Sequence, residues 1–281
     1  MKHGFELHLY ARHPQKVQDI VAEGAILHDS IASCVCACDV VITMVGFPDD
    51  VREVYMDEGG IFAHAREGQL LIDMTTSSPK LAQELAQLGR EKGLRVLDAP
   101  VTGGDAGARE GTLTILIGGR EEDAKAAWPL FEAMGSHIHH CGEAGCGQHM
   151  KLANQIMIAG ALSGVSEAAA YIQKQGMDPQ EMIDDLKAGA AGSRQLELLG
   201  PKMVRHDFAP GFFGKHFIKD MRLADAEAKE DGLQLNVLQT VLDNFEQLAE
   251  EGHADDGTQC LITRYLKSRK SIFQKAKKMI Q

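Results

Sequence analysis

Short apolar runs alternate with amphipathic stretches in the first half of the chain. The runs lie at residues 6–10, 40–45, 70–74, 96–99, 113–117 and 137–140, each of the length of one buried strand. Helical patterns lie between them at residues 14–23, 79–92 and 121–134, and the second of these opens with Ser78 as N-cap and Pro79 at the first helical position. The alternation predicts an α/β domain with a Rossmann-like, doubly wound parallel sheet.

Loops rich in Gly, Pro, Ser and Thr follow several of the predicted strands. They lie at residues 46–48, 75–79 and 100–104. In open α/β sheets, ligands bind at the carboxyl ends of the strands. We therefore expect these three loops to line a ligand site.

The alternation stops near residue 147, and the remainder reads as helical. Met150, Met157 and Val165 belong to an apolar series at helical spacing that predicts one long helix to about residue 174. Asp178 with Pro179 predicts the start of another helix, and Asn236 is expected to cap one that ends near Gly252. We expect two domains, residues 1–144 as the dinucleotide-binding domain and residues 145–281 as an all-α domain that opens with the long helix.

Composition narrows the class of protein. The 281 residues are 44% hydrophobic and 25% charged, which is typical of a globular protein of two domains. The formal charge of -11 disfavours nucleic acid as a partner. No apolar run approaches the roughly 18 residues of a membrane span, and the start lacks a secretory signal, so we expect a cytoplasmic protein without a membrane partner. The six cysteines form no disulfide framework and are expected to be reduced.

The glycine-rich motif of dinucleotide-binding sheets is absent from this sequence. A strand, G-x-G-x-x-G and a helix normally bring the backbone to a pyrophosphate, and the chain contains no such motif. It opens instead with Lys2, His3 and Gly4, which read as the end of a helix before the strand at 6–10. We expect one strand and most of one helix to be missing, which a start codon placed too late explains. Dinucleotide-binding sheets have the strand order 3-2-1-4-5-6, in which the missing first strand is a central one.

One long segment and three shorter ones carry a family resemblance. Residues 98–119, DAPVTGGDAGAREGTLTILIGG, resemble the signature of the β-hydroxyacid dehydrogenases, relatives of 3-hydroxyisobutyrate and tartronate semialdehyde dehydrogenases. The segments TMVGFP at 43–48, DMTTSSP at 73–79 and GCGQHMKLANQ at 145–155 agree in order and spacing. The resemblance covers nearly everything from Gly4 to about Leu266 and implies a dinucleotide-binding part and a helical part joined by a long helix.

The resemblance assigns the catalytic role to Lys151, in the first turns of the long helix. An ammonium group there can donate a proton to the carbonyl oxygen during reduction, and the neutral amine can accept it during oxidation. Asn154 lies three residues on, on the same helical face, and is expected to hydrogen-bond the substrate. By the same resemblance, Thr102, Gly103 and Gly104 are expected to hold a substrate carboxylate, with backbone N–H groups supplied by the glycines.

Other residues are assigned to the cofactor by resemblance. The nicotinamide half is expected to lie near a set from three loops and the carboxyl domain: Met44, Val45, Pro48, Thr75, Thr76, Phe213 and Lys219. After the strand at 6–10 the chain has Ala11, Arg12 and His13 in place of an acidic side chain that would select NAD. Because Arg12 can face a 2′-phosphate, the sequence favours NADP, with use of NAD left open.

Two clusters look like metal ligands but are predicted to hold no metal. Cys34, Cys36 and Cys38 lie at alternate positions, and in a helix Cys34 and Cys36 would point about 200° apart. The second cluster is His137, His139, His140 and Cys141, in which His139 and His140 would point to opposite faces of a strand. The last fifteen residues carry six basic residues and no acidic one. Their apolar positions predict a final helix that docks on its own domain or on a partner subunit, rather than on a membrane surface.

The sequence therefore predicts an NAD(P)-dependent oxidoreductase, a homo-oligomer that interconverts a small 3-hydroxy acid and its semialdehyde. The segment GAREGTL at 107–113 leans towards the tartronate semialdehyde reductases. The chain is too short for the 6-phosphogluconate branch of this superfamily. The alternative is a catalytically silent protein that keeps the fold for binding or assembly, because the pyrophosphate loop is absent. An imine reductase of similar fold is disfavoured, since those relatives usually lack the lysine.

Overall fold

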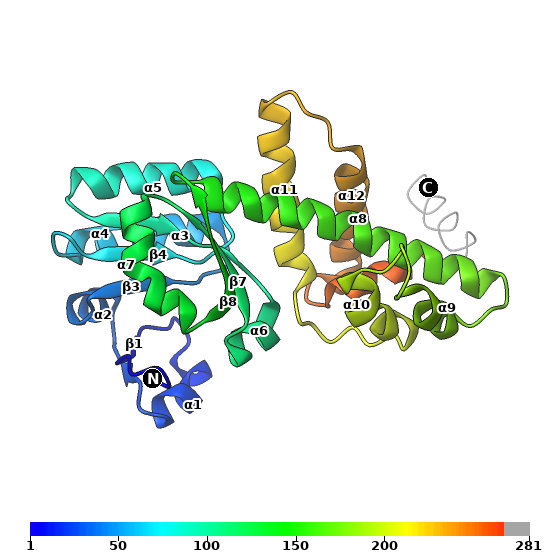
Figure 1. The fold of residues 1–281 in the computed structure, drawn as a ribbon, viewed down its shortest axis with the longest axis horizontal. Helices are drawn as coiled ribbons and strands as arrows, with labels where there is room; N and C mark the ends of the chain where they lie inside the picture. Colours follow the sequence, from blue (N-terminus) through cyan, green and yellow to red (C-terminus); the bar gives the residue numbers. More distant parts are fainter. Residues whose placement is uncertain (267–281) are drawn as a thin grey trace, which may run out of the picture. The chain divides into compact units, whose positions relative to one another are not determined.

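The computed structural model describes residues 1–266 and divides into two compact units (Figure 1). The first comprises Met1–Lys151, and the second begins at Leu152. The division falls inside the long helix α8 (Cys146–Lys174), whereas the sequence analysis placed its boundary just before this helix. The basic segment at 267–281, with its predicted docking helix, lies outside the described residues.

The first unit contains a six-stranded sheet. Its strands are β3 (Val40–Thr43), β4 (Leu70–Asp73), β5 (Arg95–Asp98), β6 (Val101–Thr102), β7 (Leu113–Gly118) and β8 (Gly135–Gly142). The order is β3-β4-β5-β7-β6, and β8 pairs with β7. The pairs β3–β4, β4–β5 and β7–β8 are parallel, so the doubly wound character is confirmed.

Strand β7 runs antiparallel to both β5 and β6, so the sheet is mixed rather than wholly parallel. The sequence analysis did not predict β6, which has only two residues. It begins three residues after the end of β5, and this is too short for a parallel crossover. The chain turns back instead, through the short helix α6 (Gly104–Glu110) into β7.

Helices cover both faces of this sheet because successive strand residues point to opposite sides. Leu71 of β4 and Val96 of β5 lie in one core cluster with α2 (Ile31–Ala37), α3 (Pro48–Met56), α4 (Ile61–His64) and α5 (Pro79–Glu91). Leu70 and Ile72, the alternate residues of β4, lie in a second cluster with helix α7 (Glu121–Glu132). Ser78 accepts a hydrogen bond from Leu81 N, which confirms the predicted cap of α5.

The start of the chain forms a separate two-stranded parallel sheet. Strand β1 (His8–Leu9) pairs with β2 (Ile26–Leu27), and no strand among the described residues joins this pair to β3. The helix expected at 14–23 is two short pieces, a 3-10 turn at Pro14–Lys16 and α1 (Gln18–Ala22). Gly4 closes a turn on Met1 O with a φ of 83°, so residues 1–4 form a turn rather than the end of a helix.

The second unit is all-helical. After α8 come α9 (Pro179–Leu186), α10 (Arg194–Val204), α11 (Gly214–Glu230), α12 (Asn236–Leu248), a π turn at Ala249–His253, a 3-10 turn at Thr258–Ile262 and α13 (Thr263–Leu266). Asp178 caps α9 by accepting a hydrogen bond from Gln180 N at 2.8 Å, as predicted. The predicted Asn236 cap is wrong, because Leu235 is the N-cap residue and Asn236 is the first helical one.

Helix α8 corrects the expectation that no stretch is apolar enough to span a membrane. By length and composition alone, its 29 residues could cross a membrane. Its buried residues Leu152, Leu162 and Ala169 belong to the core of the second unit. The helix also buries the polar side chains of Gln148 and Gln155, which are costly in lipid. We therefore interpret α8 as a core helix.

Candidate active site

The carboxylate of Asp98 fixes the start of helix α8. Asp98 ends strand β5, and its two oxygens accept hydrogen bonds from Gly145 N at 2.8 Å and Gln148 N at 2.9 Å. Backbone N–H groups at a helix start lack helical partners, so a carboxylate there both satisfies them and complements the helix dipole. Burial raises the pKa of Asp98, and the two N–H donors act in the opposite direction. The first turn of α8 is thus attached to the carboxyl end of β5.

Gln148 attaches the same turn to the loop after β4. Its Oε1 accepts a hydrogen bond from Ser77 N at 2.9 Å, and its Nε2 donates to Thr75 O at 2.8 Å. The side chain is completely buried. The loops after β4 and β5, which the sequence analysis expected to line a site, therefore meet at the start of α8.

Gly147 lets the helix approach strand β7 closely. A Cβ atom at this position would lie 2.4 Å from Leu116 O and 2.8 Å from Gly118 N. Both are backbone atoms that cannot move aside. Only glycine allows this contact, so it sets how close α8 lies to the sheet.

Lys151 lies one turn after these anchors. It shares a helical face with Gln148, three residues earlier, and is 6% exposed. Lysine is rarely this buried unless its ammonium group is paired. The structure thus places the predicted catalytic lysine on the helix segment that is anchored to the ends of β4 and β5.

A buried network holds the loops after β3 and β4 together. Asp73 Oδ1 accepts hydrogen bonds from Thr43 Oγ1 at 2.9 Å and from Thr75 N at 3.1 Å. Val45 N donates to Thr75 Oγ1 at 3.0 Å, and the Tyr55 hydroxyl lies 3.2 Å from Thr43 Oγ1. Burial raises the pKa of Asp73 to about 6, although hydrogen bonds from the two threonines act against this shift.

The predicted nicotinamide contacts differ in whether they belong to this network. Some support the loops from within the protein, and others are exposed to solvent. Thr75 is buried and its hydroxyl links the two loops. Thr76 and Pro48 are partly exposed, and Met44 is 65% exposed. Sequence reasoning missed the supporting residues Asp73 and Tyr55, although an acidic residue that ends an apolar strand is a usable signal.

The predicted carboxylate-binding loop follows β6. Thr102 is partly buried, and Gly103 and Gly104 are exposed. Gly103 has a φ of 133° and Gly104 a φ of 60°, which side chains of L-residues rarely allow. The turn therefore presents backbone rather than side chains at this position.

In the second unit, a hydrogen-bonded chain connects two of the predicted residues. Asn154 Nδ2 donates to Gln155 Oε1 at 2.8 Å, and Gln155 Nε2 donates to Asp220 Oδ2 at 2.6 Å. Asp220 Oδ1 lies 2.9 Å from Lys219 Nζ. The sequence analysis named Asn154 and Lys219 but not Gln155, which joins them through Asp220. Phe213, which precedes α11, is exposed.

Arg12 is exposed and pairs with acidic residues of helix α3. Its guanidinium lies 3.3 Å from Asp50 Oδ1 and 3.6 Å from Glu53 Oε2. A 2′-phosphate on this arginine would compete with both carboxylates. The structure therefore leaves the preference between NAD and NADP open.

The residues present fit the nicotinamide end of a dinucleotide better than its phosphates. The side chain of Met44 is exposed, and the Val45–Thr75 hydrogen bond holds the backbone next to it, so Met44 can pack against an aromatic ring. The sequence contains no G-x-G-x-x-G turn for the pyrophosphate.

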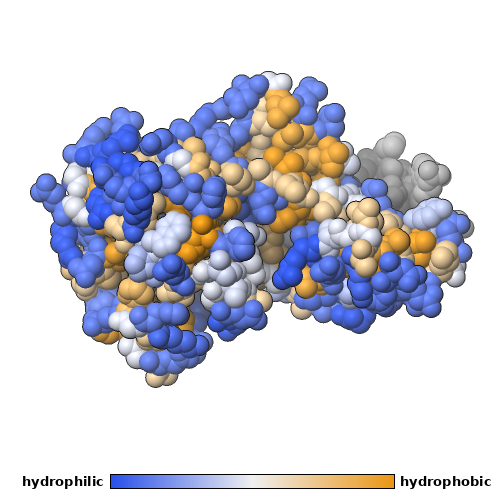
Figure 2. Space-filling view, viewed as in Figure 1, coloured by the Kyte–Doolittle hydropathy of each residue, from blue (hydrophilic) through white to orange (hydrophobic). Residues whose placement is uncertain are grey.

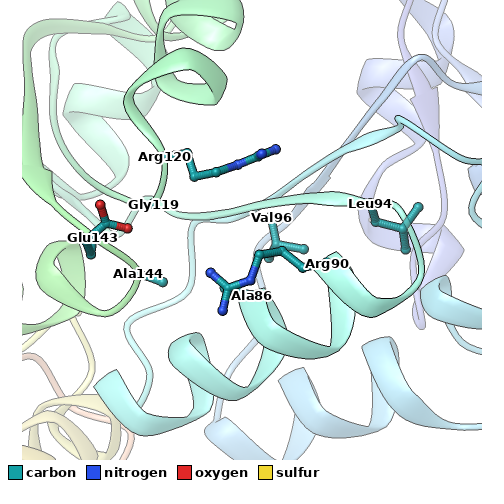
Figure 3. Close-up of a pocket in the computed structure, with 8 residues that line it drawn as sticks. All are labelled: Ala86, Arg90, Leu94, Val96, Gly119, Arg120, Glu143 and Ala144. Carbon is teal, nitrogen blue, oxygen red and sulfur yellow. The ribbon is translucent and has the colours of Figure 1, made fainter.

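A shallow hollow in the first unit lies away from these residues (Figure 3). It lies between α5 and the start of α7. Figure 3 shows the Arg90 and Arg120 side chains beside it, with Glu143 at its other end. None of the predicted site residues lines this hollow.

The two ligand-like clusters do not converge on one point. In residues 1–266, no three His, Cys, Asp or Glu side chains are close enough to share a metal ion. Burial and the neighbouring Cys38 raise the pKa of the Cys34 thiol to about 11. His140 Nε2 lies 2.7 Å from Gly119 O and already has this carbonyl as its hydrogen-bond partner.

Comparisons with known proteins agree with this organisation. A family described as the NAD binding domain of 6-phosphogluconate dehydrogenase matches residues 1–142, and one described as NAD-binding of NADP-dependent 3-hydroxyisobutyrate dehydrogenase matches residues 145–265. The chain is 45% identical over 264 residues to the uncharacterized oxidoreductase YkwC of Bacillus subtilis, covering 94% of this chain and 92% of that one. It is 36% identical to the 2-hydroxy-3-oxopropionate reductase of Escherichia coli, covering 89% and 85%.

A solved structure shows the same fold. The 3-hydroxyisobutyrate dehydrogenase of Mycobacterium tuberculosis with L-serine superposes with a TM-score of 0.83 at 30% identity, covering 93% of this chain and 91% of that one.

Proposed function

Since this chain belongs to the β-hydroxyacid dehydrogenase family, whose members are NAD(P)-dependent oxidoreductases, we propose that it interconverts a small 3-hydroxy acid and its semialdehyde. The observation that carries this proposal is the position of Lys151. It is buried on the turn of α8 that Asp98 and Gln148 hold at the carboxyl ends of β5 and β4.

The chemistry needs a proton donor at the carbonyl oxygen. When bound, the nicotinamide supplies or removes a hydride at the carbon atom. The Lys151 ammonium donates a proton to the oxygen as negative charge develops there, and in oxidation the neutral amine accepts the hydroxyl proton. Met44, Val45, Pro48 and Thr76 are proposed to contact the nicotinamide, with Thr75 as support. Phe213 and Lys219 are proposed contacts from the second unit.

A small acid with one carboxylate is the proposed substrate class. Thr102, Gly103 and Gly104 are proposed to hold that carboxylate through the hydroxyl and backbone N–H groups, and Asn154 to hydrogen-bond the substrate. Two relatives are associated with three-carbon compounds. One is the 2-hydroxy-3-oxopropionate reductase of Escherichia coli, and the other is the Mycobacterium tuberculosis dehydrogenase, whose structure was solved with L-serine. We propose a semialdehyde of three or four carbon atoms.

We also propose that the protein is a homo-oligomer, either a dimer or a tetramer. Large apolar side chains are exposed in the second unit, among them Met157 at 75%, Tyr171 at 64% and Val237 at 63%. Figure 2 shows such apolar surface among hydrophilic atoms over this unit. Exposed apolar area of this kind is typical of a subunit contact. Light scattering at several concentrations measures the mass and tests this proposal.

The test of the proposed function is turnover at saturating NADPH or NADH with a panel of semialdehydes. Lys151→Ala should lower kcat by about 10² to 10⁴, the usual contribution of a general acid. The matched control is Lys174→Ala, at the exposed end of the same helix, which should leave kcat unchanged. A loss below tenfold in Lys151→Ala contradicts the assigned role, and a wild-type protein without turnover on any substrate favours the catalytically silent alternative.

A further inference from the structure

The Gln148 side chain forms two hydrogen bonds, and their partners lie on either side of a single residue, Thr76. Thr75 O and Ser77 N are the backbone groups on either side of Thr76, and Gln148 binds both, at 2.8 Å and 2.9 Å. A planar amide that donates to one group and accepts from the other holds this stretch of backbone in one orientation. The Thr76 backbone is thus fixed by a side chain 72 positions later in the sequence.

The same side chain belongs to the helix that carries Lys151. Positions 148 and 151 are three apart on α8, so they share a face about 4.5 Å apart along the axis. Gln148 N is itself held by Asp98. One residue therefore sets the Thr76 loop and the Lys151 helix relative to each other.

We propose that Gln148 is a positioning residue that holds Thr76 in register with Lys151, so that the nicotinamide face and the proton donor are correctly aligned. This inference rests on the proposed function for its kinetic consequences. The structural part, that Gln148 fixes the Thr75–Ser77 backbone, stands on the hydrogen bonds alone. Gln148 does not act on the reacting atoms, and its effect passes through these two partners.

The chain offers a matched control in Gln69. This glutamine is also buried, its Nε2 donates to Val35 O and Cys38 O, and its Oε1 accepts from Arg66 N. It lies before the amino end of β4, at the opposite end of the strand from Thr76. Gln148→Met and Gln69→Met each remove a buried amide that joins two backbone segments, but only the first affects the proposed site.

The first readout is hydrogen exchange of backbone amides without cofactor. In Gln148→Met the Ser77 amide should exchange at least about tenfold faster, and in Gln69→Met the Arg66 amide should do the same while Ser77 is unchanged. Unchanged exchange at Ser77 in Gln148→Met overturns the structural part of the proposal. This result does not depend on whether the protein turns over any substrate.

The second readout is the kinetic split. Gln148→Met should lower kcat at least about tenfold and change the KM for the semialdehyde less than about threefold, whereas Gln69→Met should keep kcat within about twofold of the wild type. Equal effects of the two variants overturn the positioning role, because loss of stability alone would then explain both. Absence of wild-type turnover contradicts the proposed function instead, and the exchange readout still decides what Gln148 holds.

The third readout is rescue by a conservative variant. In Gln148→Glu the ionised carboxylate can accept from Ser77 N but repels Thr75 O, whereas the protonated acid can make both hydrogen bonds. Burial raises the pKa of such a carboxyl group. The ratio of variant to wild-type kcat should therefore rise at least about fivefold as the pH is lowered from about 8 to about 6. A ratio that does not change with pH overturns the requirement for both hydrogen bonds.

Discussion

The Asp98 carboxylate accepts a hydrogen bond from the backbone N–H of Gln148, which lies 50 positions later in the sequence, with Oδ2 2.9 Å from the nitrogen. This one contact ties the first turn of α8 to the end of β5. The position of this first turn, and with it that of Lys151, depends on hydrogen bonds that cap a helix from a neighbouring strand.

We predict that Asp98→Asn destabilises the first unit. The amide oxygen can replace only one of the two acceptors, and the amide nitrogen then faces an N–H donor, at a cost of about 2 kcal/mol. The melting temperature, followed by calorimetry, should fall clearly. The control is Asp178→Asn, the exposed cap of α9, for which asparagine is an adequate substitute. Equal melting temperatures of the two variants would contradict the role assigned to Asp98.

We predict that Asp73 makes stability fall as the pH rises. Burial raises its pKa from 3.8 to about 6, so the folded protein binds this proton more tightly than the unfolded chain. The stabilisation by the protonated form is present below the unfolded value and is lost as the pH rises through the folded one. Ionised Asp73 then costs about 3 kcal/mol.

Asp73→Asn tests this, because the amide oxygen can still accept from Thr43 and Thr75 N. Relative to the wild type, the variant should gain melting temperature as the pH rises from about 4 to about 6 and keep the gain at pH 7. Melting temperatures measured across this range give the comparison. Parallel curves for the two proteins would show that Asp73 is not the group responsible.

We predict that Arg12→Asp weakens NADPH relative to NADH by about tenfold, because a carboxylate would face the 2′-phosphate beside Asp50 and Glu53. The ratio of the two Kd values is the measurement. Arg52→Asp is the control, since Arg52 is an exposed arginine of α3 that pairs with Glu84. An unchanged ratio in Arg12→Asp would contradict the role assigned to Arg12.

We predict that the 281-residue chain binds NADPH only weakly, with a Kd well above the micromolar range. It contains no G-x-G-x-x-G turn, and the contacts proposed for the cofactor concern its nicotinamide end. Calorimetric titration with NADPH is the test. Micromolar affinity for NADPH would show that other groups hold the pyrophosphate.

Features that depend on a local pattern could be predicted from the sequence. Strand and helix periodicities predicted most elements of the sheet and the whole of α8, since each repeats over a few residues. Ser78 and Asp178 were identified as caps because their partners lie two or three residues away. Lys151, Thr76 and the Thr102–Gly104 loop were predicted as site residues from motifs in contiguous segments.

Which distant groups meet could be read from the folded structure but not from the sequence. The antiparallel direction of β7 follows from pairing with β5 and β6, which no local period encodes. Gln148 reaches Ser77 across 71 positions, and Asp98 reaches Gly145 across 47. A buried glutamine or aspartate looks the same in sequence whether its partner is near or far, because side-chain chemistry determines that a hydrogen bond can form but not which group is the partner. The partner is set by the folding of the chain, which here places the Thr76 loop, the end of β5 and Lys151 at the start of one helix.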